Sequence, residues 1–207
     1  MRRAVIVSTA RTAIGKAFRG AFNDTEAPAM GGHVVQHAVQ RAGIEPADVE
    51  DVIMGAAAQQ GTQSYNLGRL SAIAAGLPNT VAGMSIERQC ASGMMAIATA
   101  AKSIVCNEYD IAVAGGLESI SLVQNKHKNV YRNQSKAVLE LDEYAYMPMI
   151  ETAEVVAQRY GITRAQQDEY SLLSQTRTAA AQAACKFDDE IVPFTTQKAV
   201  FDKVTKT

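Results

Sequence analysis

The sequence lacks tryptophan, has only three cysteines among 207 residues, and shows no surplus of charge of either sign. Its 20 basic and 21 acidic residues leave a formal net charge of −1, so no global positive field points to nucleic acid or an anionic membrane. Three widely spaced cysteines, with no C-x-x-C pair, are a poor disulfide framework and a poor metal site. We therefore expect free thiols, a reducing, cytoplasmic compartment and no bound metal.

Long hydrophobic runs are also absent. The N-terminus carries two arginines and then a short apolar stretch, Val5 to Val7, before Arg11 interrupts it. This stretch is too short for the apolar part of a signal peptide and far too short for a membrane span, so we expect no membrane partner. A buried strand over Ala4 to Ser8 explains the apolar residues better.

Strand-like and helix-like segments alternate over the first 120 residues. Their patterns predict strands at 4–8, 51–55, 81–86 and 111–114, and helices at 26–42, 66–75 and 91–105. Strands separated by helices predict β-α-β units and a largely parallel sheet, which is an α/β fold. The last of these helices carries no charge before Lys102, so we expect it to be buried between layers.

The pattern changes after residue 120. We predict a locally basic loop at 124–136 and an irregular patch at 144–148. Two helices follow at 150–160 and 163–185, and then a short strand at 190–194. An excursion of this length within a compact domain is usually functional. We predict three parts: a core at 1–120, an inserted loop domain at 121–196, and a return towards the core at 197–207.

The segment S-I-E-R-Q-C-A-S-G-M-M, residues 85–95, is the first that could carry chemistry. A predicted strand runs into Cys90 and a helix begins directly after it. The helix dipole and the unpaired amides of a helix N-terminus stabilise a thiolate, which is the nucleophilic form of cysteine. Gly93 permits close backbone approach, and small Ala91 and Ser92 leave room for a substrate. The alternative is a small buried cysteine in a tight turn, and this local pattern alone favours that alternative.

Two further segments combine glycines with polar residues. In A-G-G-L-E-S-I-S, residues 114–121, the glycines end a strand, and Glu118 either orients a partner or forms a surface pair. In G-A-A-A-Q-Q-G-T-Q-S-Y-N-L-G-R, residues 55–69, the simplest interpretation is a capped loop with Asn66 as the N-cap of the next helix.

The basic stretch after residue 124 suits a phosphate-bearing ligand, although a solvated surface loop has the same composition. Its candidate binding side chains are Lys126, His127, Lys128 and Arg132. His33 and His37 lie one helical turn apart, but no carboxylate or cysteine completes a metal site around them. None of the three histidines has an obvious position from which to activate Cys90.

Taken in order, these segments resemble the thiolase family. E-R-Q-C-A-S-G at 87–93 is similar to the family's nucleophile motif N-R-x-C-x-S-G, with Glu87 in place of asparagine. A-G-G-L-E-S-I-S resembles the family's A-G-G-x-E-x-M-S, with Ile120 in place of methionine. Further similar motifs lie at 11–15, 55–69, 152–170 and 188–193. The ordered set favours Cys90 as a nucleophile over the buried alternative.

The resemblance implies a layered thiolase-like fold, of which this chain is the N-terminal βαβαβαββ half with an inserted loop domain that covers CoA. It implies an acyl-CoA C-acyltransferase in which Cys90 is the catalytic residue and forms an acyl-enzyme. Met149 joins the basic side chains as a candidate CoA-binding residue. CoA or acyl-CoA would be the substrate, with no permanently bound cofactor. Family members are dimers or tetramers, so a homo-oligomer is expected.

One departure from the family is an absence. The family's G-H-P histidine, C-x-G cysteine and N-E-A motif belong to its second half, and none occurs in this sequence. General acid–base groups contribute about a hundred- to ten-thousand-fold each, so we expect this chain alone to turn over poorly or not at all. The competing hypothesis is a non-catalytic module that binds CoA or serves as a subunit partner in a split or truncated thiolase.

Overall fold

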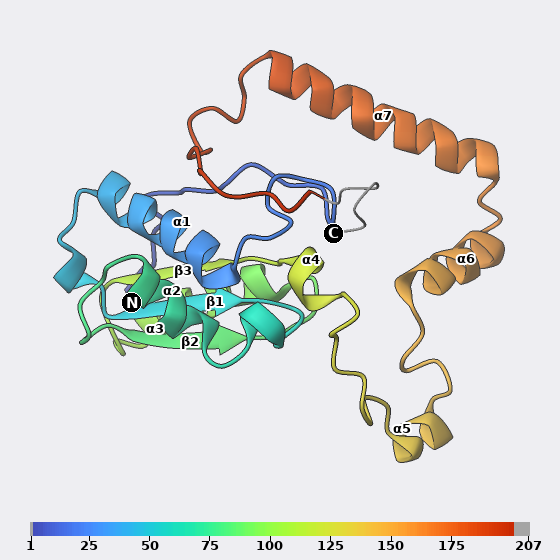
Figure 1. Cartoon of the computed structure of the whole chain (residues 1–207), viewed down its shortest axis with the longest axis horizontal. Helices are drawn as coiled ribbons and strands as arrows, with labels where there is room; N and C mark the ends of the chain where they lie inside the picture. Colours follow the sequence, from blue (N-terminus) through green and yellow to red (C-terminus); the bar gives the residue numbers. More distant parts are fainter. Residues whose placement is uncertain (1, 201–207) are drawn as a thin grey trace. The chain divides into compact units, whose positions relative to one another are not determined.

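The computed structural model describes residues 2–200 and contains one parallel three-stranded sheet (Figure 1). Its strands are β1 (Asp51–Gly55), β2 (Ala82–Ile86) and β3 (Ala112–Gly116), in the order β2-β1-β3. At the end of β1, Gly55 lies opposite Ile86 on one side and Gly116 on the other. All three strands therefore end level, at one edge of the sheet.

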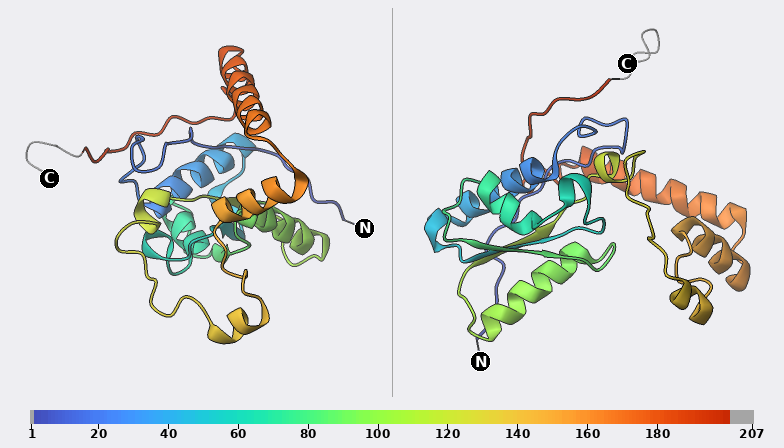
Figure 2. Two further views of the ribbon diagram at one scale, coloured as in Figure 1. Left: turned by 90° about the vertical axis from the view of Figure 1, so that its right-hand side faces the viewer. Right: turned by 60° about the horizontal axis from the view of Figure 1, so that its bottom comes forward.

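Helices cover both faces of this sheet, as a parallel sheet requires. They are α1 (Ala27–Ala42), α2 (Leu67–Ala74) and α3 (Ser92–Val105). The helices α1 and α2 lie on one face and α3 on the other (Figure 2). Along β1, Val52 and Met54 join the apolar cluster beneath α1 and α2, while Ile53 packs with Ala96 and Ala100 of α3. This arrangement confirms the predicted α/β fold.

The ends of several helices follow the predicted local signals. The helix α1 ends at Gly43, whose φ of +67° lies in the left-handed region that glycine adopts readily. Asn66 caps α2 by accepting a hydrogen bond from the Arg69 amide at 3.1 Å, as predicted. Short 3-10 turns, η1 (Pro46–Asp48) and η2 (Gly61–Gln63), precede β1 and α2, and a short helix, α4 (Ile120–Val123), follows β3.

The first predicted strand does not form. Residues 4–8 pair with no strand in the described chain, and Val5, Ile6 and Val7 are 72%, 76% and 73% exposed. An apolar run needs a covering layer to become buried, and residues 2–200 supply none at this position. Polar contacts hold the segment instead, including a hydrogen bond from the Ser8 hydroxyl to the Ala38 carbonyl at 2.6 Å.

Two other predictions about burial and pairing are wrong. The helix α3 is covered on one face only, and on its outer side Met94 is 76% and Ile97 is 43% exposed. The reason is again a missing second layer. The segment 190–194 is not a strand, because its ladder is limited to a single bridge between Ile191 and Arg11.

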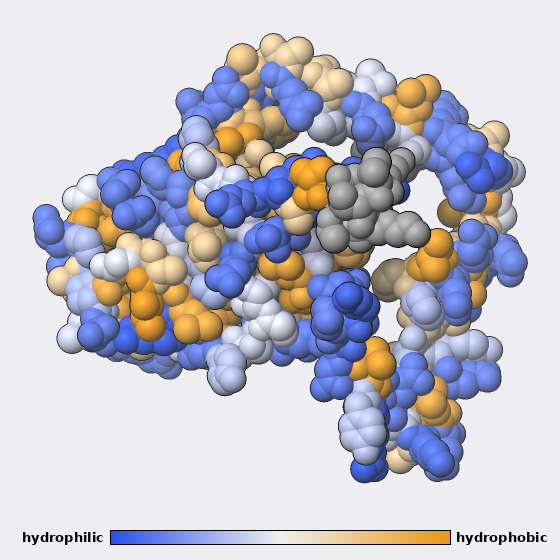
Figure 3. All heavy atoms as spheres, in the orientation of Figure 1, coloured by the Kyte–Doolittle hydropathy of each residue, from blue (hydrophilic) through white to orange (hydrophobic). Residues whose placement is uncertain are grey.

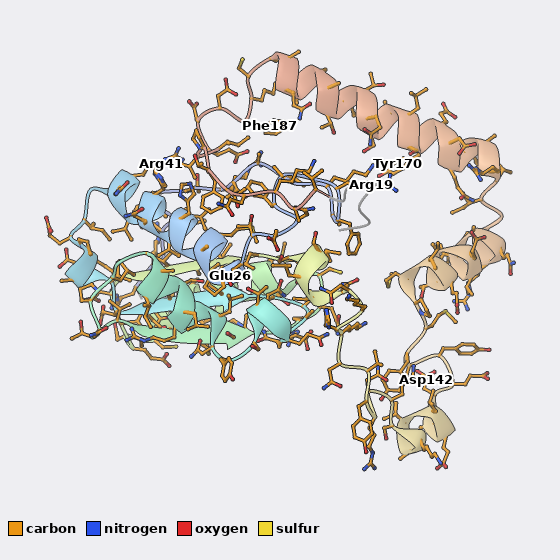
Figure 4. The ribbon with its side chains drawn as sticks, in the orientation of Figure 1. Arg19, Glu26, Arg41, Asp142, Tyr170 and Phe187 are labelled. Carbon is orange, nitrogen blue, oxygen red and sulfur yellow. The ribbon has the colours of Figure 1, made fainter. Side chains whose placement is uncertain are left out.

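The described residues divide into two compact units, one of residues 2–128 and 190–200 and the other of residues 129–189. The second unit holds α5 (Lys136–Leu141), α6 (Met149–Tyr160) and α7 (Arg164–Ala183). No residue of this unit is buried, and side chains project all around α7, where Tyr170 lies (Figure 4). The predicted three-part division stays a prediction, and its last part, 197–207, lies outside the described residues from 201 onwards.

Across residues 2–200, no helix is both long enough and apolar enough to cross a membrane.

Candidate active site

Three loops meet at the edge where the strands end. They comprise residues 56–63 after β1, 87–91 after β2 and 117–119 after β3. Backbone hydrogen bonds join them, from the Ala56 amide to the Ile86 carbonyl at 3.2 Å and from the Leu117 amide to the Gly55 carbonyl at 3.0 Å. In open parallel α/β sheets, ligands bind outside the carboxyl ends of the strands, so this edge is the first place to seek a site.

Glycines bring the first turn of α3 directly against this edge. A Cβ atom on Gly55 would collide with the backbone of Ser92, and one on Gly116 would lie 2.8 Å from the Cα of Gly93. Any larger residue at these two strand ends would push the helix away. The close approach places Cys90, two residues before the helix begins, beside the edge.

The thiol of Cys90 is exposed, and the turn that carries it is strained. Gln89, directly before it, has a φ of +47°, which non-glycine residues rarely adopt. The Glu87 carboxylate accepts a hydrogen bond from the Gln89 amide at 2.6 Å. Glu87 stands where the thiolase motif has asparagine, and its side-chain oxygen supports the turn that precedes Cys90.

Ser92 closes the same turn from the other side. Its hydroxyl oxygen accepts a hydrogen bond from the Arg88 amide at 2.8 Å, and the hydroxyl donates to the Gln89 carbonyl at 2.6 Å. The side chain is buried, and the prediction that small Ala91 and Ser92 leave room for a substrate stays a prediction. A hydroxyl two residues after a cysteine is the only sequence signal that could have indicated this role.

A second hydrogen-bond cluster joins the loops after β1 and β3. The Gln63 side chain is fully buried; its amide nitrogen donates to Glu118 at 2.7 Å and its oxygen accepts from the Ser119 amide at 2.5 Å. The other oxygen of Glu118 accepts from the Ala57 amide at 2.8 Å. Glu118 therefore orients neighbouring loops, which is one of the two roles predicted for it. The part played by Gln63 was not predicted.

The candidate CoA-binding residues fall in different units. Lys126, His127 and Lys128 are exposed in the first unit, shortly after α4. Arg132 and Met149 are exposed in the second unit, with Met149 as the first residue of α6. Within each unit, these side chains are free to meet a ligand, and none contributes to a core.

The histidines do not accompany Cys90. The rings of His33 and His37, both on α1, lie 4.6 Å apart, and His33 also lies 4.7 Å from the Phe194 ring. Burial, and then the charge of His37, lower the pKa of His33 below its ordinary value. The helix α1 covers the sheet face opposite α3, and His127 is exposed after α4. Within residues 2–200, no three His, Cys, Asp or Glu side chains gather into a metal-binding group.

The three cysteines are free and exposed, but their surroundings differ. Cys90 precedes the first turn of α3, whereas Cys106 is the C-cap of the same helix. Cys185 lies beyond α7, where a hydrogen bond to Asp188 and the negative charge of that residue raise the pKa of its thiol. Of the three, Cys90 alone lies at the N-terminal end of a helix.

An exposed cysteine thus lies at a helix N-terminus, beside the carboxyl edge of a parallel α/β sheet that helices cover on both faces. The family described as the thiolase N-terminal domain matches residues 4–207 of the chain. The chain belongs to the thiolase family.

Individual relatives agree with this assignment. The chain is 40% identical over 193 residues to a 3-ketoacyl-CoA thiolase of Bacillus subtilis, covering 93% of this chain and 49% of the relative. It is 41% identical over 203 residues to an acetyl-CoA acetyltransferase of Cupriavidus necator, covering 93% and 51%. The crystal structure of the Bacillus anthracis acetyl-CoA acetyltransferase matches with a TM-score of 0.81 at 38% identity, covering 96% of this chain and 52% of that one. The chain thus spans about half the length of these relatives.

Proposed function

We propose that this chain supplies the nucleophilic half of an acyl-CoA C-acyltransferase, with Cys90 as the residue that takes up the acyl group. The observation that carries the proposal is the exposed Cys90 thiol at the N-terminal end of α3, in a chain of the thiolase family. The names of the relatives support acyl-CoA thioesters as the substrate class.

The proposed reaction has two steps. In the first step of synthesis, the Cys90 thiolate attacks the carbonyl carbon of acetyl-CoA, the C–S bond to CoA breaks, and CoA leaves as a thiolate that takes up a proton. In the first step of degradation, the thiolate attacks the 3-oxo carbon of a 3-oxoacyl-CoA, the bond between C2 and C3 breaks, and the acetyl-CoA carbanion leaves and takes up a proton. In the second step, the acyl group passes from Cys90 to CoA or to the carbanion of acetyl-CoA, and the Cys90 thiolate is restored. Splitting one difficult transfer through a covalent intermediate lowers its barrier. The backbone amide of Cys90 would hold the developing oxyanion.

We propose that the candidate binding residues take part in CoA recognition. Their exposed cationic groups suit the CoA phosphates, since Lys and Arg form short, charge-assisted hydrogen bonds to phosphate oxygens. The set comprises Lys126, His127, Lys128, Arg132 and Met149. CoA would bind as a substrate in each turnover. The three free thiols fit a reducing compartment, and we propose the cytoplasm.

The chain by itself should stop after the first step. In the described residues, the side chains that hydrogen-bond within the Cys90 turn are Glu87 and Ser92, and both are engaged by backbone groups of the turn. A complete catalytic cycle would therefore need acid–base groups from outside this chain, each contributing about a hundred- to ten-thousand-fold.

Intact mass after incubation with acetyl-CoA tests the proposal. We expect one acetyl group on the wild-type chain and on Cys106→Ala, and none on Cys90→Ala. Cys106→Ala is the matched control because that residue lies at the other end of the same helix. An adduct that survives in Cys90→Ala, or the lack of any adduct on the wild type, would contradict the assignment of Cys90.

A specific observation also favours a second role, that of a subunit partner. Val5, Ile6 and Val7 are exposed, as are Met94 and Ile97 on the outer side of α3, and hydrophobic side chains reach the surface of the sheet-bearing unit (Figure 3). Exposed apolar surface of this kind marks association sites. We propose that a second copy or a separate thiolase C-terminal half covers it.

Sedimentation tests this second role. It should show concentration-dependent association that Met94→Lys weakens, with Met149→Lys as the control on the second unit. A monomer at all concentrations, unaltered by an added C-terminal half, would contradict this role.

A further inference from the structure

We propose that Ser92 is a positioning residue that locks the strained turn before α3 and so holds Cys90 at the helix N-terminus. The inference rests on the proposed function of Cys90 as the nucleophile, and it assigns to a buried hydroxyl the task of aiming that nucleophile. The carrying geometry is a pair of hydrogen bonds from one oxygen to the two residues that precede Cys90.

The Ser92 hydroxyl hydrogen-bonds on both sides of the strained residue, Gln89. It accepts from the amide of Arg88, just before Gln89, and donates to the carbonyl of Gln89 itself. Gln89 has a φ of +47°, a conformation that side chains with a Cβ rarely adopt. A residue keeps a strained conformation only where surrounding contacts hold it there. On the side of the turn that faces α3, the side-chain group that holds Gln89 is the Ser92 hydroxyl.

Burial makes these two hydrogen bonds hard to replace. Ser92 is 3% exposed, and the end of β1 at Gly55 lies against its backbone. Both hydrogen bonds are part-buried, and the Arg88 amide and the Gln89 carbonyl lose this partner once the hydroxyl is removed. Buried polar groups that lose a partner cost far more than exposed ones, so the turn should rearrange in Ser92→Ala.

Rearrangement moves Cys90 relative to the helix. The remaining links across the turn are the Glu87 carboxylate, which accepts from the Gln89 amide, and two backbone hydrogen bonds. These run from Ala91 to Arg88 at 3.0 Å and from Ser92 to Gln89 at 3.1 Å, and both depend on the same left-handed residue. If the turn relaxes, the thiol leaves the first turn of α3 and loses the favourable field of the helix N-terminus. A purely structural serine would leave that field at Cys90 unchanged.

The test compares how fast a charged and a neutral reagent attack each cysteine, because the electric field of the helix N-terminus favours the approach of an anion. Alkylation is followed separately at each cysteine with anionic iodoacetate and with neutral iodoacetamide. The rate with iodoacetate divided by the rate with iodoacetamide gives a ratio for each cysteine, and Cys106 at the opposite end of α3 is the internal reference. A terminal helix field corresponds to about a two- to fivefold effect at low ionic strength. We expect a higher ratio at Cys90 than at Cys106 in the wild type, and loss of that difference in Ser92→Ala.

A matched serine separates positioning from general destabilisation. Ser71 is also buried, but its hydroxyl has no hydrogen-bond partner within residues 2–200. Ser71→Ala should keep the wild-type ratio at Cys90. Ser92→Thr, which keeps the hydroxyl, should also keep it. If Ser92→Ala lowers the melting temperature too far for measurement, adding Gln89→Gly should restore folding without restoring the ratio, because glycine permits the turn without holding it.

Acetylation by acetyl-CoA, followed on the same variants, separates this inference from the proposed function. Where the wild type is acetylated, Ser92→Ala should slow the reaction by up to about a hundredfold, as misplaced reacting groups do. No acetylation of the wild type would count against the proposed function alone, since the alkylation ratio still reports on Ser92. A ratio at Cys90 that stays at the wild-type value in Ser92→Ala, or that falls equally in Ser71→Ala, would overturn the positioning role.

Discussion

At the scale of single residues, the buried polar groups divide according to their partners. Gln63 uses both ends of its amide in hydrogen bonds, whereas one carboxylate oxygen of Asp51 is buried with no partner in residues 2–200. Burial raises the pKa of Asp51 above its ordinary value of 3.8, and a hydrogen bond from the Val52 backbone offsets only part of this effect. The charged form of Asp51 therefore lowers the stability of the fold near neutral pH.

Asp51→Asn should for this reason raise the melting temperature at pH 7. An aspartate with a raised folded-state pKa destabilises the fold above that pKa, and the effect disappears as the pH falls towards 3.8. The gain from Asn should therefore shrink as the solution is acidified. Thermal unfolding followed by circular dichroism at several pH values measures it, with the exposed Asp110→Asn as the control. A gain that is the same at pH 4 and pH 7 would show that charge is not its cause.

Gln63→Ala should be among the more damaging single changes in the first unit. It removes a fully buried amide and leaves the Ser119 amide without its partner, while Glu118 loses one of its donors. Unsatisfied buried groups cost about 1–3 kcal/mol each, so we expect a loss of about 2–4 kcal/mol in the free energy of unfolding. Urea denaturation measures the loss. Gln59→Ala, at an exposed amide in the same loop, should cost less than about 1 kcal/mol.

At the scale of elements, α7 depends on its own sequence. Its 20 residues include none that is buried, so packing within the described chain contributes little to it. What fixes its start is a capping box: the Thr163 amide donates to the Gln166 side chain at 2.8 Å, and the Gln166 amide donates to the Thr163 hydroxyl at 3.3 Å. Thr followed three residues later by Gln is the sequence pattern of such a box.

Thr163→Ala should therefore shorten or fray α7. Loss of an N-cap hydroxyl costs about 1 kcal/mol of helix stability, and a helix with no buried face has nothing to compensate it. Hydrogen exchange should speed up in the first turn of α7 and stay unchanged in α3, which the sheet supports. Thr163→Ser, which keeps the hydroxyl, should behave like the wild type; equal protection in the Ala variant would mean that other contacts hold this helix.

The elements also show how far a sequence can be interpreted. The three strands and the helices α1, α2 and α3 were predicted within a few residues, because periodicity and glycine positions are local signals. The exposure of Val5 to Val7 and of the outer side of α3 was not predicted. An apolar run shows that a segment suits a core, but it does not show that the covering layer belongs to the same chain. For the site, the place of Cys90 was predicted. The hydrogen bond between Gln63 and Glu118 joins residues 55 apart in sequence, a distance at which local patterns carry no information.

At the scale of the whole molecule, the two units differ in how much they bury. The sheet-bearing unit has two apolar clusters, whereas no residue between 129 and 189 is buried. Local opening costs little where few side chains are buried. The second unit should therefore exchange its amide hydrogens and admit proteases well before the first.

Limited proteolysis with trypsin checks this difference. We expect the earliest cuts at basic residues between 129 and 189, such as Arg159 and Arg177, with the segment from β1 to β3 left intact. Arg69 is an internal control, because its side chain hydrogen-bonds to the Asn79 carbonyl at 3.2 Å within the sheet-bearing unit. Cleavage at Arg69 as early as at Arg177 would show that the second unit gains protection from contacts beyond its own burial.

The level ending of the three strands also bears on how the nucleophile comes into being during synthesis. The loops at the sheet edge leave the ribosome one after another. The hydrogen bond from the Leu117 amide to the Gly55 carbonyl can form only after residue 117 has been synthesised. Cys90 is thus translated well before the surroundings that set its geometry exist. Pairing of this range is slow compared with helix formation, because the intervening chain must be ordered first. A nascent chain that ends before residue 117 would carry the cysteine as an ordinary thiol, so its reactivity at Cys90 would report, codon by codon, the moment at which the sheet is complete.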